Sequence, residues 1–326
     1  MGAAELTERL LTRRRFLRIF GRAGLPFALS GILVGAPEAQ QQAGPAEVHH
    51  IHGLAIGRRN PEVVYVATHT GLVRIQPKAA PEWVGSHRHD LMGFTAHPHE
   101  PNLVYASGHP DAATYRQLQT GNLGLLVSRD GGKTWQSVAL KGDADFHALA
   151  YTPRNGGQLY GWSVAGETGL HRISTTSWKV ERLRAEGLSN VWSLAASPEP
   201  AGPLLAGTKS GLMVSRDAGS NWSRVTKGIR ANMTVTAVSF HTSDPTVVYA
   251  YMASADRGLM RSRDGGATWE SAGYVGDPRA PVVVLAVGPG EHVALAATNS
   301  NVLRSSDGGR SWQPILERGR PVTGSR

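Results

Sequence analysis

The sequence contains no cysteine among its 326 residues. This excludes disulfide bonds, thiolate metal sites, cysteine nucleophiles and anchoring through a lipid-modified cysteine. Charged residues are also scarce, at 18%. The formal net charge of +9 comes mostly from scattered arginines, without the basic stripe interleaved with aromatic residues that nucleic-acid binding requires. We therefore expect no nucleic-acid partner.

Glycine and tryptophan are well represented, with 39 and 8 residues. A glycine-rich, weakly charged chain with many tryptophans suits a β protein with many turns better than a helical one. The chain is long for one ordinary core, so we expect either two domains or one large β architecture. Without disulfides, the fold must be held by its own apolar core.

The N-terminal segment carries an export pattern. Two adjacent arginines at Arg13 and Arg14 are followed by Phe16, Leu17 and the basic Arg18. This resembles a twin-arginine signal, and we assign residues 1–39 to it and 40–47 to a linker. The apolar stretch 19–36 is too short and too interrupted for a transmembrane helix. The resemblance implies a periplasmic or extracellular protein that meets the membrane only through this segment, if the segment is not cleaved.

A short motif, Ser-x-Asp-x-Gly-x-x-Trp, recurs four times. The Asp can accept hydrogen bonds from backbone N–H groups a few residues on, and the Gly supplies a positive φ angle. Each copy follows an apolar strand, so each is expected to be a hairpin turn whose role is structural. The motif resembles the Asp-box, or bacterial neuraminidase repeat, of sialidase-like β-propellers. The motif aspartates are Asp130, Asp217, Asp264 and Asp307.

The spacing of the motifs gives the number of repeats. Consecutive motif aspartates are 87, 47 and 43 residues apart, so a degenerate copy is expected in the first interval, and residues 169–178 fit it. A period of 40 to 55 residues with four strands is typical of a propeller blade. Six units cover residues 48–318, and 319–326 are left as a C-terminal tail. The sequence thus predicts an all-β, six-bladed propeller of four-stranded blades, with the Asp boxes between the third and fourth strands.

This architecture predicts where chemistry can occur. The starts of the inner strands and the ends of the second strands share one face, and the Asp boxes lie on the opposite face. Histidines gather on the first face in blades 1 to 3, whereas the position equivalent to His50 holds Asn190, Thr234 and Pro281 in blades 4 to 6. These histidines are His49, His50, His52, His69, His87, His89, His109 and His147, and Asp90 and Asp145 occupy the position of His50 in blades 2 and 3.

Three interpretations of this face remain open. Imidazoles and carboxylates can hold Zn, Cu, Ni or Mn, for which His52, His89 and His147 are the expected ligands of a transition metal. They can serve acid–base chemistry, with Asp90 and Asp145 as the catalytic pair. They can also simply line a polar channel. For a carbohydrate or small-molecule ligand, the expected contact residues are His50, His69, His109, Trp162 and Trp192.

Four segments, 50–53, 89–94, 106–110 and 145–149, resemble a group of exported bacterial proteins described as glycosyl-hydrolase-like. Sialidases themselves carry an arginine triad, a tyrosine nucleophile and an Arg-Ile-Pro motif, and none of these is recognisable in this chain. We therefore carry three hypotheses: a propeller that binds a ligand on the face of blades 1 to 3, an active glycoside hydrolase, and a scaffold for protein assembly. A glycoside hydrolase needs its two carboxyl groups about 5 to 9.5 Å apart.

Overall fold

The computed structural model describes residues 47–230 and 232–322. The chain divides into two units, Met1–Gln41 and Gln42–Arg326, and every described residue belongs to the second. The predicted signal segment and all but the last residue of the predicted linker therefore lie outside the described residues. No helix in the described part of the chain is long and apolar enough to cross a membrane.

The second unit consists of six antiparallel sheets, each built from consecutive strands. Blade 1 contains β1 (Ile51–Ile56), β2 (Val64–Thr68), β3 (Gly71–Ile75) and β4 (Glu82–Trp83). Blade 2 contains β5 (Asp90–Ala96), β6 (Val104–His109), β7 (Leu125–Ser128) and β8 (Gln136–Ala139), with helix α1 (Ala112–Leu118) between β6 and β7. Blade 3 contains β9 (Phe146–Thr152), β10 (Gln158–Ser163), β11 (Gly169–Ser174) and β12 (Val180–Arg182), with a 3₁₀ turn, η1 (Arg154–Gly156), after β9.

The second half of the ring repeats the same plan. Blade 4 contains β13 (Val191–Ala196), β14 (Leu204–Thr208), β15 (Gly211–Ser215) and β16 (Ser223–Arg224). Blade 5 contains β17 (Val235–Phe240), β18 (Val248–Met252), β19 (Gly258–Ser262) and β20 (Glu270–Ser271). Blade 6 contains β21 (Val282–Val287), β22 (Val293–Ala297), β23 (Val302–Ser305), β24 (Gln313–Glu317) and β25 (Arg320–Pro321).

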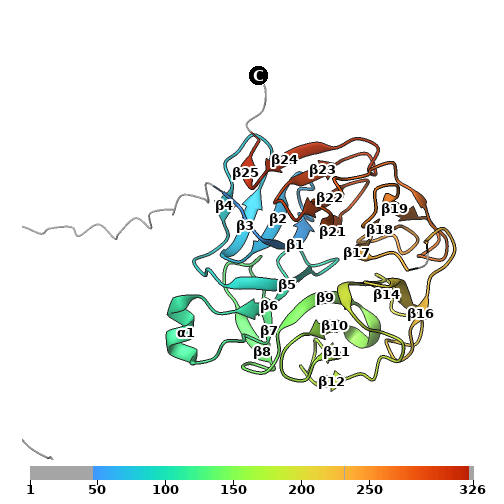
Figure 1. The fold of residues 1–326 in the computed structure, drawn as a ribbon. Helices are drawn as coiled ribbons and strands as arrows, with labels where there is room; N and C mark the ends of the chain where they lie inside the picture. The colour runs from blue at the N-terminus through green and yellow to red at the C-terminus, as the bar shows by residue number, and fades with distance from the viewer. Residues whose placement is uncertain (1–46, 231, 323–326) are drawn as a thin grey trace, which may run out of the picture. The chain divides into compact units, whose positions relative to one another are not determined.

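The six innermost strands form the wall of a ring (Figure 1). Each contacts the inner strand of the next blade, and β21 of blade 6 contacts β1 of blade 1. The prediction of an all-β, six-bladed propeller is confirmed. Residues 319–326, predicted as a tail, differ in one respect: β25 pairs with β24, so Arg320 and Pro321 extend the last blade.

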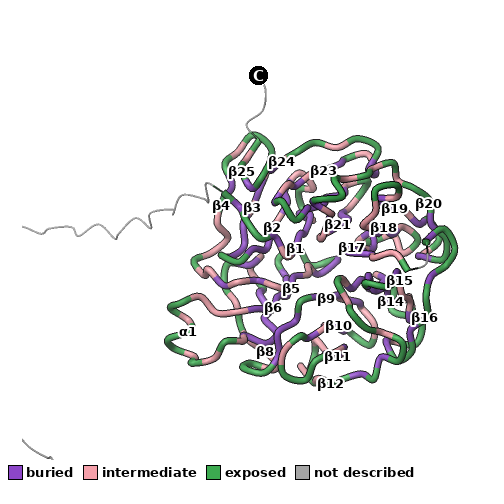
Figure 2. Tube along the Cα trace, in the orientation of Figure 1, coloured by how far each residue is buried: buried purple, intermediate pink, exposed green. Residues whose placement is uncertain are grey.

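Apolar side chains between neighbouring blades hold the ring together. Six clusters of buried residues occur in the described chain, and each joins one blade to the next. The inner and middle strands carry most of this burial, while the short outer strands β12, β16 and β20 are largely exposed (Figure 2). Because a single four-stranded sheet leaves both apolar faces in water, each blade depends on its neighbours for stability.

No strand is exchanged between the first and last described blades, so side chains and one backbone bond close the ring. Val48 N–H donates to the Gly319 carbonyl at 2.7 Å, and the cluster around Val48 includes residues of β21 to β24. Glu47 forms an ion pair with Arg320, and Glu62 forms a second with the buried Arg304.

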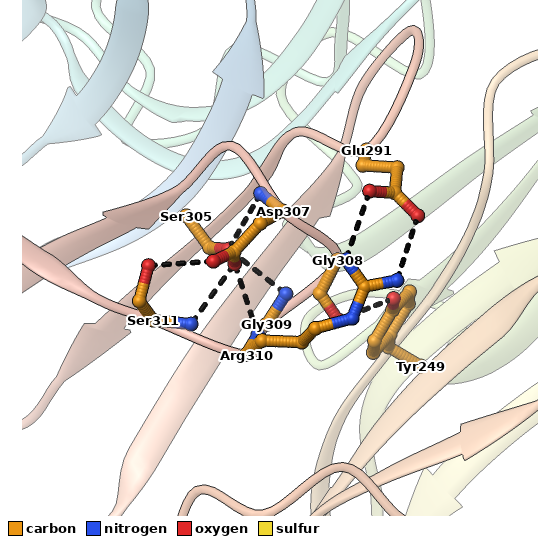
Figure 3. Close-up of polar contacts among 8 residues, drawn as sticks. All are labelled: Tyr249, Glu291, Ser305, Asp307, Gly308, Gly309, Arg310 and Ser311. Carbon is orange, nitrogen blue, oxygen red and sulfur yellow. Dashed lines mark hydrogen bonds and ion pairs between the residues drawn. The ribbon is translucent and has the colours of Figure 1, made fainter.

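The Asp boxes are satisfied hydrogen-bonded turns between the third and fourth strands of blades 2, 4, 5 and 6, as predicted. In the last of them, Asp307 accepts hydrogen bonds from the backbone N–H groups of Arg310 and Ser311 and from the Ser311 hydroxyl, at 3.0, 2.9 and 2.6 Å (Figure 3). Gly308 N–H donates to Glu291 in the turn between β21 and β22. The boxes therefore lie beside the first turns of their blades, on one face of the propeller.

Every inner strand has a β-bulge near its start. The register of each inner strand against its neighbour shifts by one residue at an equivalent position in all six blades. The bulged residues are His52, Met92, His147, Trp192, Thr236 and Val283. A bulge redirects the side chain of its extra residue, and four of these six residues line the channel: His52, His147, Trp192 and Val283.

We predict that Asp264→Ala lowers the free energy of unfolding by roughly 1–2 kcal/mol at pH 7, because Asp264 accepts bonds from Ala267 N–H, Thr268 N–H and the hydroxyls of Thr268 and Ser262. Burial raises its pKa, but these bonds outweigh burial and lower it from 3.8 to about 2. The stabilisation is therefore complete above pH 4 and is lost as the pH falls towards 2.

Urea unfolding of both proteins at pH 7, 4 and 3 measures this difference. The control is Asp143→Ala, which removes an exposed aspartate whose side chain makes no hydrogen bond to the described residues and should change stability by less than about 0.5 kcal/mol. Equal stability of Asp264→Ala and wild type at pH 7 would contradict a structural role for the box.

Candidate functional site

The channel enclosed by the inner strands is the main cavity of the described chain. It has a volume of about 180 Å³, and its wall is formed by residues of all six inner strands. On the face opposite the Asp boxes, the bulged residues His52, His147 and Trp192 line it. In blades 4 to 6, the position equivalent to His50 carries no titratable side chain, so the imidazoles and carboxylates of this mouth come from blades 1 to 3.

The first group of side chains at the mouth consists of His52, His69 and Asp90. Their nearest nitrogen and oxygen atoms all lie within 4.8 Å of one another. His69 follows β2, and its Nδ1 lies 3.2 Å from Asp90 Oδ2. The ring centroids of His52 and His69 are 4.5 Å apart. The ring of His50 lies edge-on to that of His69, with 4.8 Å between the centroids. Two imidazoles and one carboxylate thus converge from blades 1 and 2.

Two polar atoms of this group are buried and unpartnered. His52 Nε2 and Asp90 Oδ1 are shielded from solvent and make no hydrogen bond within the described chain. Burial and then the nearby imidazole of His69 lower the pKa of His52 to about 4, so it is neutral near pH 7. Burial also raises the pKa of Asp90, and the nearby Asp145 adds to this effect. An unsatisfied buried polar atom is costly, so both atoms are available to a hydrogen-bond partner or to an ion.

The second group at the mouth is centred on Asp145, in the connection that leads into β9. Asp145 Oδ2 lies 2.8 Å from His147 Nε2 and 3.5 Å from His109 Nε2. The Asp145 side chain is only 5% exposed, and its second oxygen, Oδ1, is buried without a partner. Asp90 and His109 face each other in register on β5 and β6, so the two groups are neighbours.

A third cluster, His87, His89 and Asp111, is chemically different because the Asp111 carboxylate and His89 Nδ1 already have backbone N–H partners. Asp111 caps helix α1 by accepting from Thr114 N–H at 2.8 Å and also accepts from Arg88 N–H at 3.1 Å. Burial raises the pKa of Asp111, but these backbone bonds outweigh it and lower the pKa to about 2. His89 Nδ1 accepts from Asp111 N–H at 3.1 Å. This cluster fixes the segment before β5 to the loop that carries α1.

These positions change one prediction about the site. His52, His89 and His147 were expected to share a metal, but His89 lies in the third cluster with its Nδ1 occupied and its side chain buried. Its burial also lowers its pKa to about 4. His69 and Asp90, expected as a ligand contact and as one of the catalytic pair, lie beside His52. His89 is held in the third cluster by Asp111, the N-cap residue of α1. The sequence pattern of strands does not predict this cap.

The two tryptophans predicted as ligand contacts differ in their exposure and in what they pack against. Trp162 is half-buried and packs against the apolar cluster that joins blades 3 and 4. Trp192 is 56% exposed, occupies the bulge of blade 4 and lines the channel. Trp192 is therefore the aromatic side chain available to a ligand at the mouth.

Comparison with known proteins agrees with the repeat pattern. A family model described as BNR/Asp-box repeat matches residues 126–137, and one described as Photosynthesis system II assembly factor YCF48 matches residues 170–322. The second match covers blades 4 to 6 and the end of blade 3, and the two residue groups at the channel mouth lie outside it. A search of curated protein sequences finds no match.

Among solved structures, the chain is similar to the GH74 xyloglucanase from Xanthomonas campestris, with 21% identity and a TM-score of 0.51, over 85% of this chain and 39% of that one. It is similar to an ancestral GH74 enzyme, with 16% identity and a TM-score of 0.53, over 85% and 40% of the two chains. A structure of YCF48 bound to D1 peptide has 14% identity and a TM-score of 0.47 over 84% of each chain.

The chain spans about two fifths of the length of the GH74 proteins. At these identities the likeness shows the fold alone. The four Asp boxes, the closed ring of six blades and the repeat match at residues 126–137 show a six-bladed β-propeller that carries Asp-box (BNR) repeats.

Proposed function

We propose that this protein is an exported metal-binding propeller whose channel mouth holds a divalent transition metal ion. His52, His69 and Asp90 are the proposed ligands. The observation that carries the proposal is the convergence of their three donor atoms within 4.8 Å, with His52 Nε2 and Asp90 Oδ1 buried and unpartnered. A metal ion held by these three residues would give His52 Nε2 a partner and would neutralise the Asp90 carboxylate.

The spacing of the donors suits such an ion. Two ligands at about 2.0–2.1 Å from a tetrahedral zinc lie about 3.3 Å apart. His69 Nδ1 and Asp90 Oδ2 already lie 3.2 Å apart. Two imidazole nitrogens and one carboxylate favour Zn, Mn, Ni or Cu, because Mg²⁺ and Ca²⁺ prefer oxygen ligands alone. Three protein ligands leave a coordination position open towards the channel, where a small molecule could approach beside Trp192.

Export is part of the proposal. The twin-arginine pattern at Arg13 and Arg14 supports transport to the periplasm or beyond. That route moves folded proteins, so a metal can be loaded in the cytoplasm before export.

We predict that the full-length protein retains metal after purification, and that His69→Ala binds one equivalent less Zn²⁺ than wild type. Losing a direct ligand should weaken binding at least about 100-fold, since losing an outer-shell partner alone costs 10–100-fold. Equilibrium dialysis against Zn²⁺ with elemental analysis measures the bound metal.

Two matched controls accompany this measurement. His99→Ala removes an exposed histidine from the opposite face, and His87→Ala removes one from the third cluster. Both should bind as much Zn²⁺ as wild type. Equal binding by His69→Ala and wild type would refute the proposed ligand set.

A second candidate function is glycoside hydrolysis, and the state of Asp90 favours it. A general acid needs a raised pKa, and burial raises that of Asp90. Asp145 is the carboxylate beside it that could act as nucleophile or base. The likeness to GH74 enzymes supports a shared fold and does not by itself support this chemistry.

We predict that a panel of aryl glycosides, a sialoside included, separates the two functions. If the protein is a hydrolase, Asp90→Asn and Asp145→Asn should each lower turnover at least about 100-fold, as expected when a general acid or base is removed. Asp143→Asn, the matched exposed aspartate, should leave turnover unchanged. Turnover that persists in Asp90→Asn and Asp145→Asn would rule out this pair as catalytic.

A third role, as a scaffold for protein assembly, draws its support from the YCF48 family match over residues 170–322. Large exposed apolar side chains in the described chain are Tyr115, Val164, Trp192, Val275 and Val322. They come from different blades, and the convergence of three donor atoms at the channel mouth favours the metal site over a docking role.

A further inference from the structure

We propose that His109, Asp145 and His147 form a second cation site, so that the channel mouth holds a pair of divalent transition metal ions. This inference concerns residues outside the first set of ligands and adds to the proposed function. It rests on the orientation of His109, on the free oxygen of Asp145 and on the position of both beside the first group.

A hydrogen bond to the backbone fixes the orientation of the His109 ring. Its Nδ1 lies 2.8 Å from the carbonyl oxygen of Gly121. A carbonyl oxygen can only accept a hydrogen bond, so Nδ1 carries the proton, and neutral His109 has its lone pair on Nε2. That lone pair lies 3.5 Å from the carboxylate oxygen Asp145 Oδ2. Two acceptors that face each other require a cation or a proton between them.

This orientation is the one that metal-binding histidines adopt. A histidine that binds a metal through one ring nitrogen almost always donates the other N–H to a carbonyl or carboxylate, which fixes the tautomer and the ring plane. His109 has such a partner in Gly121. His89 in the third cluster has the opposite arrangement, because its Nδ1 accepts from the backbone of Asp111 and is no longer available. The two histidines therefore differ in the atom they can offer to a metal.

Asp145 has a fixed backbone and one carboxylate oxygen without a partner. Its backbone is fixed, because its carbonyl accepts from Val164 N–H at 2.9 Å and the next residue, Phe146, donates to the Ser107 hydroxyl at 3.0 Å. Its Oδ2 faces the two imidazoles, and its Oδ1 is buried and has no partner. Oδ2 already accepts a hydrogen bond from His147 Nε2 at 2.8 Å, and a bound cation would take the place of that proton, while Oδ1 keeps unused capacity to accept.

The two proposed sites are adjacent. Asp90 of the first site and His109 of the second are cross-strand partners on β5 and β6. His52 and His147 occupy equivalent bulges of blades 1 and 3 and line the same cavity. Paired metal ions in proteins lie about 3.5–4 Å apart and share a bridging water or hydroxide.

The stoichiometry of metal binding tests this inference. We predict that dialysed wild-type protein binds two equivalents of Zn²⁺, that His109→Ala and Asp145→Asn each bind one, and that His99→Ala still binds two. His69→Ala should also bind one, through the second site. Circular dichroism and thermal unfolding of each variant establish that it is folded.

The outcomes separate this inference from the proposed function. One equivalent in wild type, retained by His109→Ala and lost by His69→Ala, overturns the second site and leaves the first. One equivalent that is lost by His109→Ala and retained by His69→Ala overturns the first site and supports this group as the only one. No bound Zn²⁺ in wild type overturns both.

Discussion

The β-bulge near the start of each inner strand is the constraint on which the channel mouth depends. It recurs in all six blades and redirects one residue of each inner strand. The repeat makes the six positions structurally equivalent, while the sequence makes them chemically different. Histidine occupies the bulge in blades 1 and 3 and tryptophan in blade 4, so the symmetry of the fold produces an asymmetric site.

The two faces of the propeller use aspartate in opposite ways. In the Asp boxes, each carboxylate accepts several short hydrogen bonds, and its charge is fully used in holding a turn (Figure 3). At the channel mouth, Asp90 and Asp145 each keep one buried oxygen without a partner. An unsatisfied buried polar group costs about 1–3 kcal/mol, so two carboxylates with such an oxygen beside one cavity are the groups that a bound cation would stabilise most.

Much of this architecture could be predicted from the sequence because it is local and repeated. The apolar strands, the Asp boxes and the degenerate turn at 169–178 each follow from a short pattern. The face that carries the histidines follows from strand order alone. The predicted C-terminal tail differs from the structure because β25 pairs with β24 after a tight turn at Gly319. This turn is not part of the repeat, so the repeat pattern could not predict it.

The composition of the site could be predicted only in part. Its ligands come from separate blades, so no spacing along the chain marks them as partners. His69 reaches Asp90 only because blade 1 packs against blade 2. His89 Nδ1 accepts from the backbone of Asp111, the residue that caps helix α1, and so is not free to bind a metal. A sequence pattern can place each of these residues on a face, but only the packing of blades decides which atoms meet and which remain without partners.

The most direct measurement of the central claim is an anomalous-diffraction experiment on crystals grown with Zn²⁺, with data collected on both sides of the zinc absorption edge. The account predicts anomalous peaks at the channel mouth, within about 2.0–2.2 Å of His52 Nε2, His69 Nδ1 and an oxygen of Asp90. Peaks confined to other parts of the protein, or a mouth that stays free of zinc at saturating concentration, would contradict it.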